Sequence, residues 1–394
     1  MVASEILKVL YAPHKVFKEI VQNPKYLGVL LVFILVIAAQ SAYYYAQSEK
    51  IYYEQSSPSI DQLGTWTTNA TLWTASANAT ITNNYQDFLN SSYNGENVYG
   101  NGSLQFSASN SNDLSMTLPN FNSVNCGSSS FQNLSVRITE LSPQTAPTKV
   151  TLTLYSLSNP NYFQYDLTSA FSNASLIGFW NNVTVPIGQN SANWQSNGNP
   201  QWTNITGLKL EFSFASNGNI TLLMEGLFFR GLYQTFSQIS GAGLTATILQ
   251  QTIFSFVFEW LFLTGLLYLI IKGLKGQVTW KPLFIAIGFL LIVIAIQAII
   301  SLAATQTLPI VHSPIEFQTQ LQGEAAAINN SINAQTQAYS LITSIVQLLT
   351  YVWIVALGAF VVRALQPEFS LTKSALASAA ALVVTIILMS LLGI

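Results

Sequence analysis

Residue types that carry chemistry are scarce in this sequence of 394 residues. It has two histidines, His14 and His312, and a single cysteine, Cys126. A histidine-based triad, a Cys–His pair or a zinc site needs several such residues that can meet in the fold, and a disulfide needs a second cysteine. Two carboxylates could still hydrolyse a glycosidic bond, but the acidic residues between Asp61 and Glu225 are scattered singly. We therefore predict that the protein is not an enzyme and has no catalytic residues, no cofactor and no metal.

One carboxylate stands in an unusual environment. Glu259 lies in the middle of an apolar stretch that is long enough to cross a bilayer. A charged carboxylate is costly there, so the residue would be neutral or paired inside a helical bundle. In one interpretation it is a proton or ligand site. In the other, it is hydrogen-bonded across helices to Gln297, Gln347 or Thr350, or to a partner subunit. The lack of a basic residue at matching depth and of any relay of titratable groups favours the second.

The composition indicates which elements must position these residues. Hydrophobic residues make up 50% of the chain and charged residues only 8%. Soluble domains contain about 25% charged residues, so an ordinary soluble enzyme is excluded. The formal net charge of -2 provides no basic surface for nucleic acid. The chain is therefore expected to be a membrane protein that binds no nucleic acid.

Five apolar stretches have the length of a bilayer-spanning helix. They cover residues 26–45, 246–271, 283–304, 342–362 and 374–392. About 20 residues suffice to cross a hydrocarbon core of about 30 Å. Ahead of the first stretch, residues 1–25 alternate apolar and lysine-bearing faces on either side of Pro13, a pattern typical of two short helices at the cytoplasmic membrane interface.

Basic residues orient the five spans. They precede the first span and flank the loops after the second and fourth, at Lys8, Lys15, Lys18, Lys25, Lys272, Lys275, Lys281, Arg363 and Lys373. Because basic loops stay in the cytoplasm, the N-terminus is predicted to be cytoplasmic. Residues 49–235, the loop 305–339 and the C-terminus are then outside.

Acceptor motifs for N-glycosylation, Asn-x-Ser/Thr, test that orientation. There are ten, at Asn69, Asn78, Asn90, Asn101, Asn133, Asn173, Asn182, Asn204, Asn219 and Asn329. All ten lie in segments predicted to be outside, although a segment so rich in Asn, Ser and Thr would contain several by chance. Acceptor motifs without paired cysteines suit an archaeal cell envelope, with a bacterial protein as the alternative.

The long outer segment predicts an all-β domain. Residues 48–130 are polar and low in complexity, whereas residues 131–235 alternate apolar and polar side chains in several short runs. Runs of strand length with turn signals about every 10 residues favour a β-sandwich or jelly roll. Asn217-Gly218, between two alternating runs, predicts a β-hairpin.

The fold class predicted is thus a five-span α-helical transmembrane bundle with an all-β sandwich or jelly-roll extracellular domain. The segments are expected to be interfacial helices at 1–25, span one at 26–47, a polar part at 48–130, a β core at 131–235, and spans two to five at 236–394 with the loop 305–339. That loop is expected to form a helix continuing into span four.

The outer domain offers aromatic residues that could stack on sugar rings. These are Trp66, Trp73, Trp180 and Trp194, although tryptophans more often fill a core. The stretch from Trp202 to Phe229 resembles the closing strands of galactose-binding-like jelly rolls. That resemblance implies a domain of a class whose members often bind sugars, and it carries over no contact residue.

The membrane part resembles a known family. Ala-Pro-His-Lys-Val-Phe-Lys-Glu-Ile at 12–20, followed by Asn23-Pro24 and a hydrophobic span, looks like the opening of the Yip family of five-span proteins. Residues 276–281 are similar to a Gly-containing loop of that family, and Trp353 with residues 363–365 and 370–376 matches its last two spans. The resemblance implies a non-enzymatic membrane domain with a cytoplasmic N-terminus. The large insertion after span one departs from the compact eukaryotic members, so their trafficking role is not carried over.

These features favour a structural or accessory subunit of a membrane or envelope complex, with the lipid bilayer and other proteins as partners. A permease-like subunit of an ABC-type exporter is one alternative, although such permeases usually have six spans and this chain has no ATPase motif. A surface protein that binds glycans is another.

Overall fold

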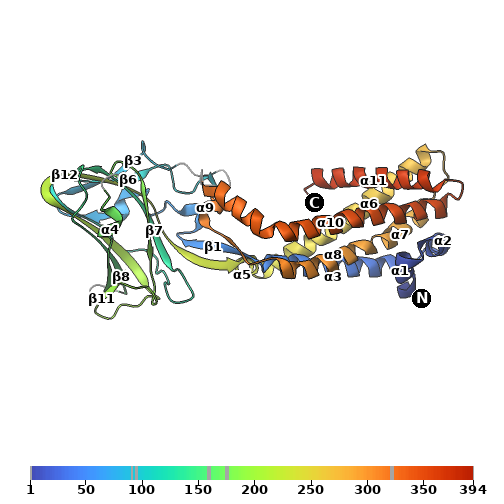
Figure 1. The fold of residues 1–394 in the computed structure, drawn as a ribbon, viewed down its shortest axis with the longest axis horizontal. Helices are drawn as coiled ribbons and strands as arrows, with labels where there is room; N and C mark the ends of the chain where they lie inside the picture. The colour runs from blue at the N-terminus through green and yellow to red at the C-terminus, as the bar shows by residue number, and fades with distance from the viewer. Residues whose placement is uncertain are drawn as a thin grey trace. The chain divides into compact units, whose positions relative to one another are not determined.

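The computed structural model describes residues 2–89, 92–93, 96–157, 161–173, 177–319 and 324–393 (Figure 1). The chain divides into two compact units. The helical unit comprises Met1–Tyr52, Thr235–Val311 and Ser331–Ile394. The β unit comprises Tyr53–Gln234 and His312–Asn330. The coarse prediction, a unit of long apolar helices and a unit of antiparallel β-structure, is confirmed.

The helical unit is built from nine described helices, one of which begins in the β unit. They are α1 (Val2–Tyr11), α2 (Pro13–Gln22), α3 (Tyr26–Ser48), α5 (Phe236–Ser240), α6 (Ala242–Gly273), α7 (Trp280–Leu290), α8 (Ile292–Ala304), α10 (Glu324–Leu365) and α11 (Leu371–Leu391). A 3₁₀ turn, η4 (Thr305–Thr307), follows α8. The loop 305–339, expected to be helical, contains the strand residues Val311–Ser313 in its first part, and from Glu324 it belongs to the continuous helix α10.

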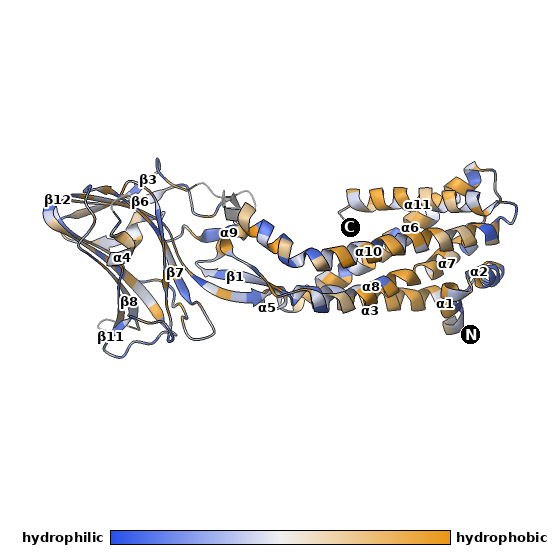
Figure 2. Cartoon of the chain, in the orientation of Figure 1, coloured by the Kyte–Doolittle hydropathy of each residue, from blue (hydrophilic) through white to orange (hydrophobic). Residues whose placement is uncertain are grey.

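Five helical segments are long and apolar enough to cross a membrane (Figure 2). They are Tyr26–Ser48, Ala242–Gly273, Trp280–Thr307, Ala326–Leu365 and Leu371–Leu391, and they coincide with the five predicted stretches to within a few residues at most ends. The third is the central helix of the unit, because 72% of its most apolar part is buried, against 22% to 39% for the other four.

Those four peripheral helices expose large apolar side chains. Examples are Leu30, Ile34, Leu249, Phe254, Leu348, Leu349, Val352, Val383 and Ile387. A continuous apolar exterior of this kind is unfavourable in water and marks a surface covered by lipid or by other protein.

Small residues let the central helix approach its neighbours closely. A side chain at Gly28 of α3 would collide with the ring of Phe289, and one at Gly288 of α7 would collide with Val29. Close backbone approach at small residues is the usual way in which membrane helices gain van der Waals contact. Trp260 of α6 adds a polar contact, because its indole N–H donates to the Phe284 carbonyl oxygen at 2.7 Å.

The β unit contains thirteen described strands, three of which reach its boundaries with the helical unit. They are β1 (Ile51–Ser57), β2 (Thr74–Ala75), β3 (Ala79–Asn84), β4 (Ser92–Tyr93), β5 (Glu96–Asn97), β6 (Ser103–Leu118), β7 (Asn133–Ser142), β8 (Lys149–Ser156), β9 (Tyr162–Asp166), β10 (Asn181–Pro186), β11 (Gln195–Asn197), β12 (Ile205–Thr235) and β13 (Val311–Ser313). Short helices are η1 (Ile60–Gln62), η2 (Ala70–Leu72), α4 (Thr168–Phe171) and α9 (Ile315–Gln318).

One long strand organises this unit. The strand order is β10-β7-β12-β8-β9-β11, and β12 also pairs with β1 and β6. The first part of β12 pairs with β8, as in Lys209 opposite Thr153, and its second part pairs with β7, as in Met224 opposite Ile138. Strand β6 is antiparallel to both parts. A strand that is shared between the two layers of a sandwich must pair with a different neighbour in each layer, as β12 does.

The predicted hairpin at Asn217-Gly218 is wrong. Strand β12 continues through these residues, and both flanking runs pair with β6 instead of with each other. The register shifts between Ser213 and Ile220, so the segment is an irregular, bulge-like part of a strand. A two-residue hairpin needs positive φ at its centre, whereas the positive φ here is at Asn110 of the facing strand β6.

The core of the β unit starts well before residue 131. It includes Trp66, Trp73, Leu104 and Phe106, all from the stretch that the sequence showed as polar. The last two lie on β6, which alternates between core and surface. On β12, Phe212 is 1% exposed and meets the Phe171 ring edge to face at 5.2 Å between centroids.

Replacing Phe212 tests this core. Phe212→Ala should lower the free energy of unfolding of the β unit by about 3–5 kcal/mol, because it removes apolar contact and leaves a cavity. Tyr85→Ala is the matched control, since Tyr85 is 67% exposed. Urea titrations of the detergent-solubilised protein, followed by tryptophan fluorescence, measure both. Equal midpoints for the two variants would contradict the assigned packing.

Candidate functional site

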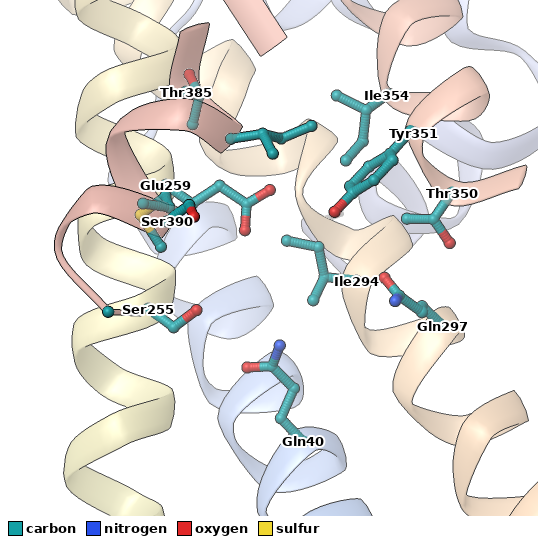
Figure 3. Close-up of a pocket in the computed structure, with 13 residues that line it drawn as sticks. Gln40, Ser255, Glu259, Ile294, Gln297, Thr350, Tyr351, Ile354, Thr385 and Ser390 are labelled. Carbon is teal, nitrogen blue, oxygen red and sulfur yellow. The ribbon is translucent and has the colours of Figure 1, made fainter. Parts of the chain in front are cut away.

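A polar cavity of about 500 Å³ lies inside the helical unit (Figure 3). All five long helical segments contribute polar side chains to it. These are Gln40 of α3, Ser255 and Glu259 of α6, Gln297 of α8, Thr350 and Tyr351 of α10, and Thr385 and Ser390 of α11. Apolar side chains, among them Ile294, Ile354, Ile386 and Met389, complete the wall.

Half of these eight polar residues lie at the same distance from the basic end of their segment. One end of each segment carries or adjoins lysine or arginine. Four of the polar residues lie 14 residues from that end: Gln40 from Tyr26, Glu259 from Gly273, Tyr351 from Leu365 and Thr385 from Leu371. At a rise of 1.5 Å per residue this is about 21 Å. The cavity is thus formed by a layer of polar side chains, of which the sequence had singled out only some.

Glu259 points into the cavity (Figure 3). The predicted hydrogen bond to Gln297, Gln347 or Thr350 is not formed, and no described residue donates to its carboxylate. Gln297 and Thr350 line the same cavity, but the Thr350 hydroxyl donates to the Val346 carbonyl oxygen at 2.9 Å. Gln347 is exposed and donates to the Tyr351 hydroxyl at 2.7 Å.

A sequence argument could have found the remaining members of this layer. Gln40, Tyr351 and Thr385 are ordinary polar residues in apolar stretches, and nothing in their immediate neighbours marks them. Their equal distance from the basic ends is the signal, because long helices that pack side by side with their basic ends together bring residues at equal distances close to one another.

The β unit contains a buried ionic cluster around Arg230. Its guanidinium donates from Nε and Nη2 to both carboxylate oxygens of Glu54, at 2.8 and 2.7 Å. It also donates to both oxygens of Glu316, with 2.9 Å from Nη2 to Oε2. Glu54 is 2% exposed, and its oxygens further accept from the main-chain N–H groups of Gly231 and Ile315. Burial acts to raise the pKa of Glu316, but the hydrogen bonds from Arg230 outweigh it and hold that pKa below its usual value.

A cleft of about 290 Å³ adjoins this cluster. Its lining includes Tyr99, Arg137, Asn182, Arg230 and Glu316. Arg137 lies under the Trp180 ring, 4.9 Å from its centroid, and 3.4 Å from the Glu225 carboxylate. The Trp180 indole in turn donates to Asp87 at 2.9 Å. The cleft therefore combines an aromatic face with cationic, anionic and amide groups, which suits a polar ligand with several hydroxyls.

Glu225 is fully buried beside this cleft. Its two oxygens accept from the Leu89 main-chain N–H, each at 2.8 Å. Burial raises the pKa of Glu225 to about 7, although the Leu89 hydrogen bond and the Arg137 charge act in the opposite direction. Glu140 is similar, since burial raises its pKa to about 7.

The four tryptophans proposed as sugar platforms have different environments. Trp66 and Trp73 are 8% and 4% exposed and belong to the core, where the Trp73 indole donates to the Trp66 carbonyl oxygen at 2.6 Å. Trp194 is half-buried and packs edge to face on Trp202. Trp180, half-buried over Arg137, is the one that lies beside the cleft.

The acceptor asparagines that the structure describes all lie in the β unit. Asn69, Asn78, Asn101, Asn173, Asn182, Asn219 and Asn329 are exposed, whereas Asn133 and Asn204 are half-buried. Asn90 lies outside the described residues. Within those residues, no group of three or more His, Cys, Asp or Glu side chains could hold a metal ion.

No family model matches the chain, and no curated protein matches it. A family 11 carbohydrate-binding module from Clostridium thermocellum is similar in structure, with 8% identity, a TM-score of 0.26, and coverage of 40% of this chain and 86% of the module. A β-1,2-glucanase from Parabacteroides distasonis has 10% identity and a TM-score of 0.28, over 40% of this chain and 22% of that enzyme. Similarities at such TM-scores assign neither a family nor a function.

The raised pKa of Glu225 predicts how stability depends on pH. Between its ordinary value of 4.5 and about 7, the folded state keeps a proton that the unfolded state has lost. Stability should therefore fall as pH rises through this range, by up to about 3 kcal/mol. Glu225→Gln should reduce this slope in urea titrations at several pH values, while Glu140 maintains part of it. Glu211→Gln, at a half-exposed surface pair with Lys209, is the control, and an unchanged slope in Glu225→Gln would refute the assignment.

Proposed function

We propose that the chain is a membrane-anchored, non-enzymatic accessory protein of the cell envelope. Its five long helices cross the membrane, and its β unit stands outside. The observation that carries this proposal is the apolar exterior of the helical unit, where residues such as Leu348, Leu349 and Val352 are 60% to 63% exposed. Lipid is the environment in which such helices are stable.

Charge and connectivity support the orientation. The basic residues lie at the start of α3, around the α6–α7 connection and around the α10–α11 connection. The chain enters and leaves the β unit through the other ends of α3, α6, α8 and α10. Positive residues favour the cytoplasmic side, so the β unit, with its described acceptor asparagines, is outside. The resemblance of the membrane part to the Yip family favours the same orientation.

The way in which the charged groups are paired supports the accessory role. In the β unit, Arg230 is saturated by Glu54 and Glu316, and Arg137 is paired with Glu225. Charged groups that pair with one another stabilise the fold of the β unit. Recognition of a partner then depends on the surface of this unit. Glycan binding is the second candidate function. It is favoured by the cleft that Tyr99 and Arg137 line, with Trp180 stacked on Arg137 beside it, since aromatic faces with nearby polar groups bind sugars well.

Cysteine labelling of intact cells tests the topology. Cys126 is fully buried, so the unmodified protein should react little with a membrane-impermeant maleimide. Asn217→Cys in the β unit should be labelled in intact cells. Thr279→Cys and Glu368→Cys, at exposed positions in the two predicted cytoplasmic connections, should be labelled only after lysis. Labelling of all three in intact cells, or the inverse pattern, would refute the orientation.

Purification from native membranes in mild detergent, followed by mass spectrometry, tests the accessory role. A protein present at a fixed ratio to this chain is expected, and an ATPase among such proteins would identify an exporter. Trp180→Ala should release a partner that docks at the cleft, whereas Tyr85→Ala, an exposed aromatic elsewhere on the β unit, should retain it. A chain that purifies alone as a glycosylated monomer would contradict the accessory role and make a glycan array the next test.

A further inference from the structure

The cavity of the helical unit contains a carboxylate without a partner. Glu259 points into a partly open space that residues of five helical segments line, and no described residue forms a hydrogen bond or ion pair with it. We propose that this cavity binds an ammonium group, carried by a small organic amine or by a lipid headgroup. The proposal goes beyond the accessory function and does not depend on it.

The sign of the charge in the cavity selects a cation. Glu259 is its one acidic lining residue, and no lysine, arginine or histidine is among the described residues that line it. The last turn of α11 reaches the cavity with Ser390, and the C-terminal end of a helix carries a partial negative charge. Most basic residues of the helical unit lie near the end of the bundle formed by the start of α3, the end of α6 and the start of α11. That end is about 21 Å from Gln40 and Glu259 along the helices.

Unsatisfied acceptors point to a donor-rich ligand. Gln40 Oε1 is buried and has no hydrogen-bond partner among the described residues. A buried acceptor without a partner costs about 1–3 kcal/mol, so a ligand that donates to it gains that stabilisation. An ammonium group has three donors. Glu259 and Gln40 offer acceptors from two helices, and the lining hydroxyl of Ser255 offers another.

Size and apolar surface favour an organic cation over a bare ion. The cavity of about 500 Å³ far exceeds the volume of a metal ion, and it lies within the range of small-molecule sites. Ile294, Ile354, Ile386 and Met389 provide an apolar wall for a short hydrocarbon chain. In such surroundings a carboxylate and an ammonium group stabilise each other only as a pair, because each is costly alone.

Titration of the full-length protein in maltoside detergent tests the proposal. The probe is n-butylammonium chloride, the neutral control is 1-butanol, and calorimetry measures binding. Wild-type protein should bind butylammonium and not butanol. Glu259→Gln keeps the shape of the side chain and should weaken binding by roughly thirtyfold or more, because a buried charge loses its partner. Glu211→Gln, in the β unit, should bind like the wild type.

A second variant guards against loss of folding. Gln40→Leu removes the unpartnered acceptor and should weaken binding several-fold, while circular dichroism checks that the helix content of both cavity variants is retained. Equal butylammonium affinity in wild type, Glu259→Gln and Gln40→Leu would overturn the proposal, as would binding of butanol with the affinity of butylammonium.

Nanodiscs distinguish the two sources of the ammonium group. If the headgroup of a lipid occupies the cavity, phosphatidylethanolamine should compete with butylammonium and lower its apparent affinity relative to phosphatidylcholine, whose quaternary nitrogen has no N–H donor. Equal affinity in both lipids would assign the site to a free amine. No binding in either lipid or in detergent would overturn the proposal.

Discussion

A guanidinium group that leaves water keeps its proton at any ordinary pH, so the burial of Arg230 dictates what must surround it. Glu54 and Glu316 take its donors in pairs, and the main-chain N–H groups of Gly231 and Ile315 satisfy what remains of Glu54. These contacts join β1, β12 and α9, which are far apart in the sequence. Loss of one partner would leave an uncompensated buried charge that costs about 3–5 kcal/mol. The three segments are therefore ordered together, and the sheet that β12 organises depends on them.

The helical unit meets the same cost of desolvation in another way. Its lysines and arginines lie in the short helices α1 and α2 or near the ends of the long helices, and several of its interior hydroxyls bond to their own helix. Thr252, Thr350 and Thr385 each donate to the carbonyl oxygen four residues earlier, at 2.8 to 2.9 Å. A hydroxyl can use this local acceptor, but an ionised carboxylate cannot, because it has no proton to donate. Glu259 is consequently left to face the cavity.

The long helices could be predicted from the sequence because hydropathy over about 20 residues is a local property. The path of β12 could not. Asn217-Gly218 permits both a hairpin turn and an irregular strand, and the choice was made by β6, whose residues lie about 100 positions earlier. The pairing of Arg230 with Glu54 spans 176 positions, so no local sequence pattern indicates it. Of the helical cavity, Glu259 and Gln297 were anticipated, whereas Gln40 and Tyr351 were missed because their depth, not their neighbours, brings them there.

Glu225 and Glu259 show how the surroundings decide what the same carboxyl group can do. Glu225 is fully buried, but Leu89 and Arg137 of the same chain donate to it, so its hydrogen-bonding needs are met within the β unit. Glu259 has no such donors among the described residues. A buried polar group whose partners are not in its own chain is stable only when water, lipid, a ligand or another protein supplies them. Of these two carboxyl groups, Glu225 is therefore satisfied within its own unit, and Glu259 is the one that a group from outside the chain would complete.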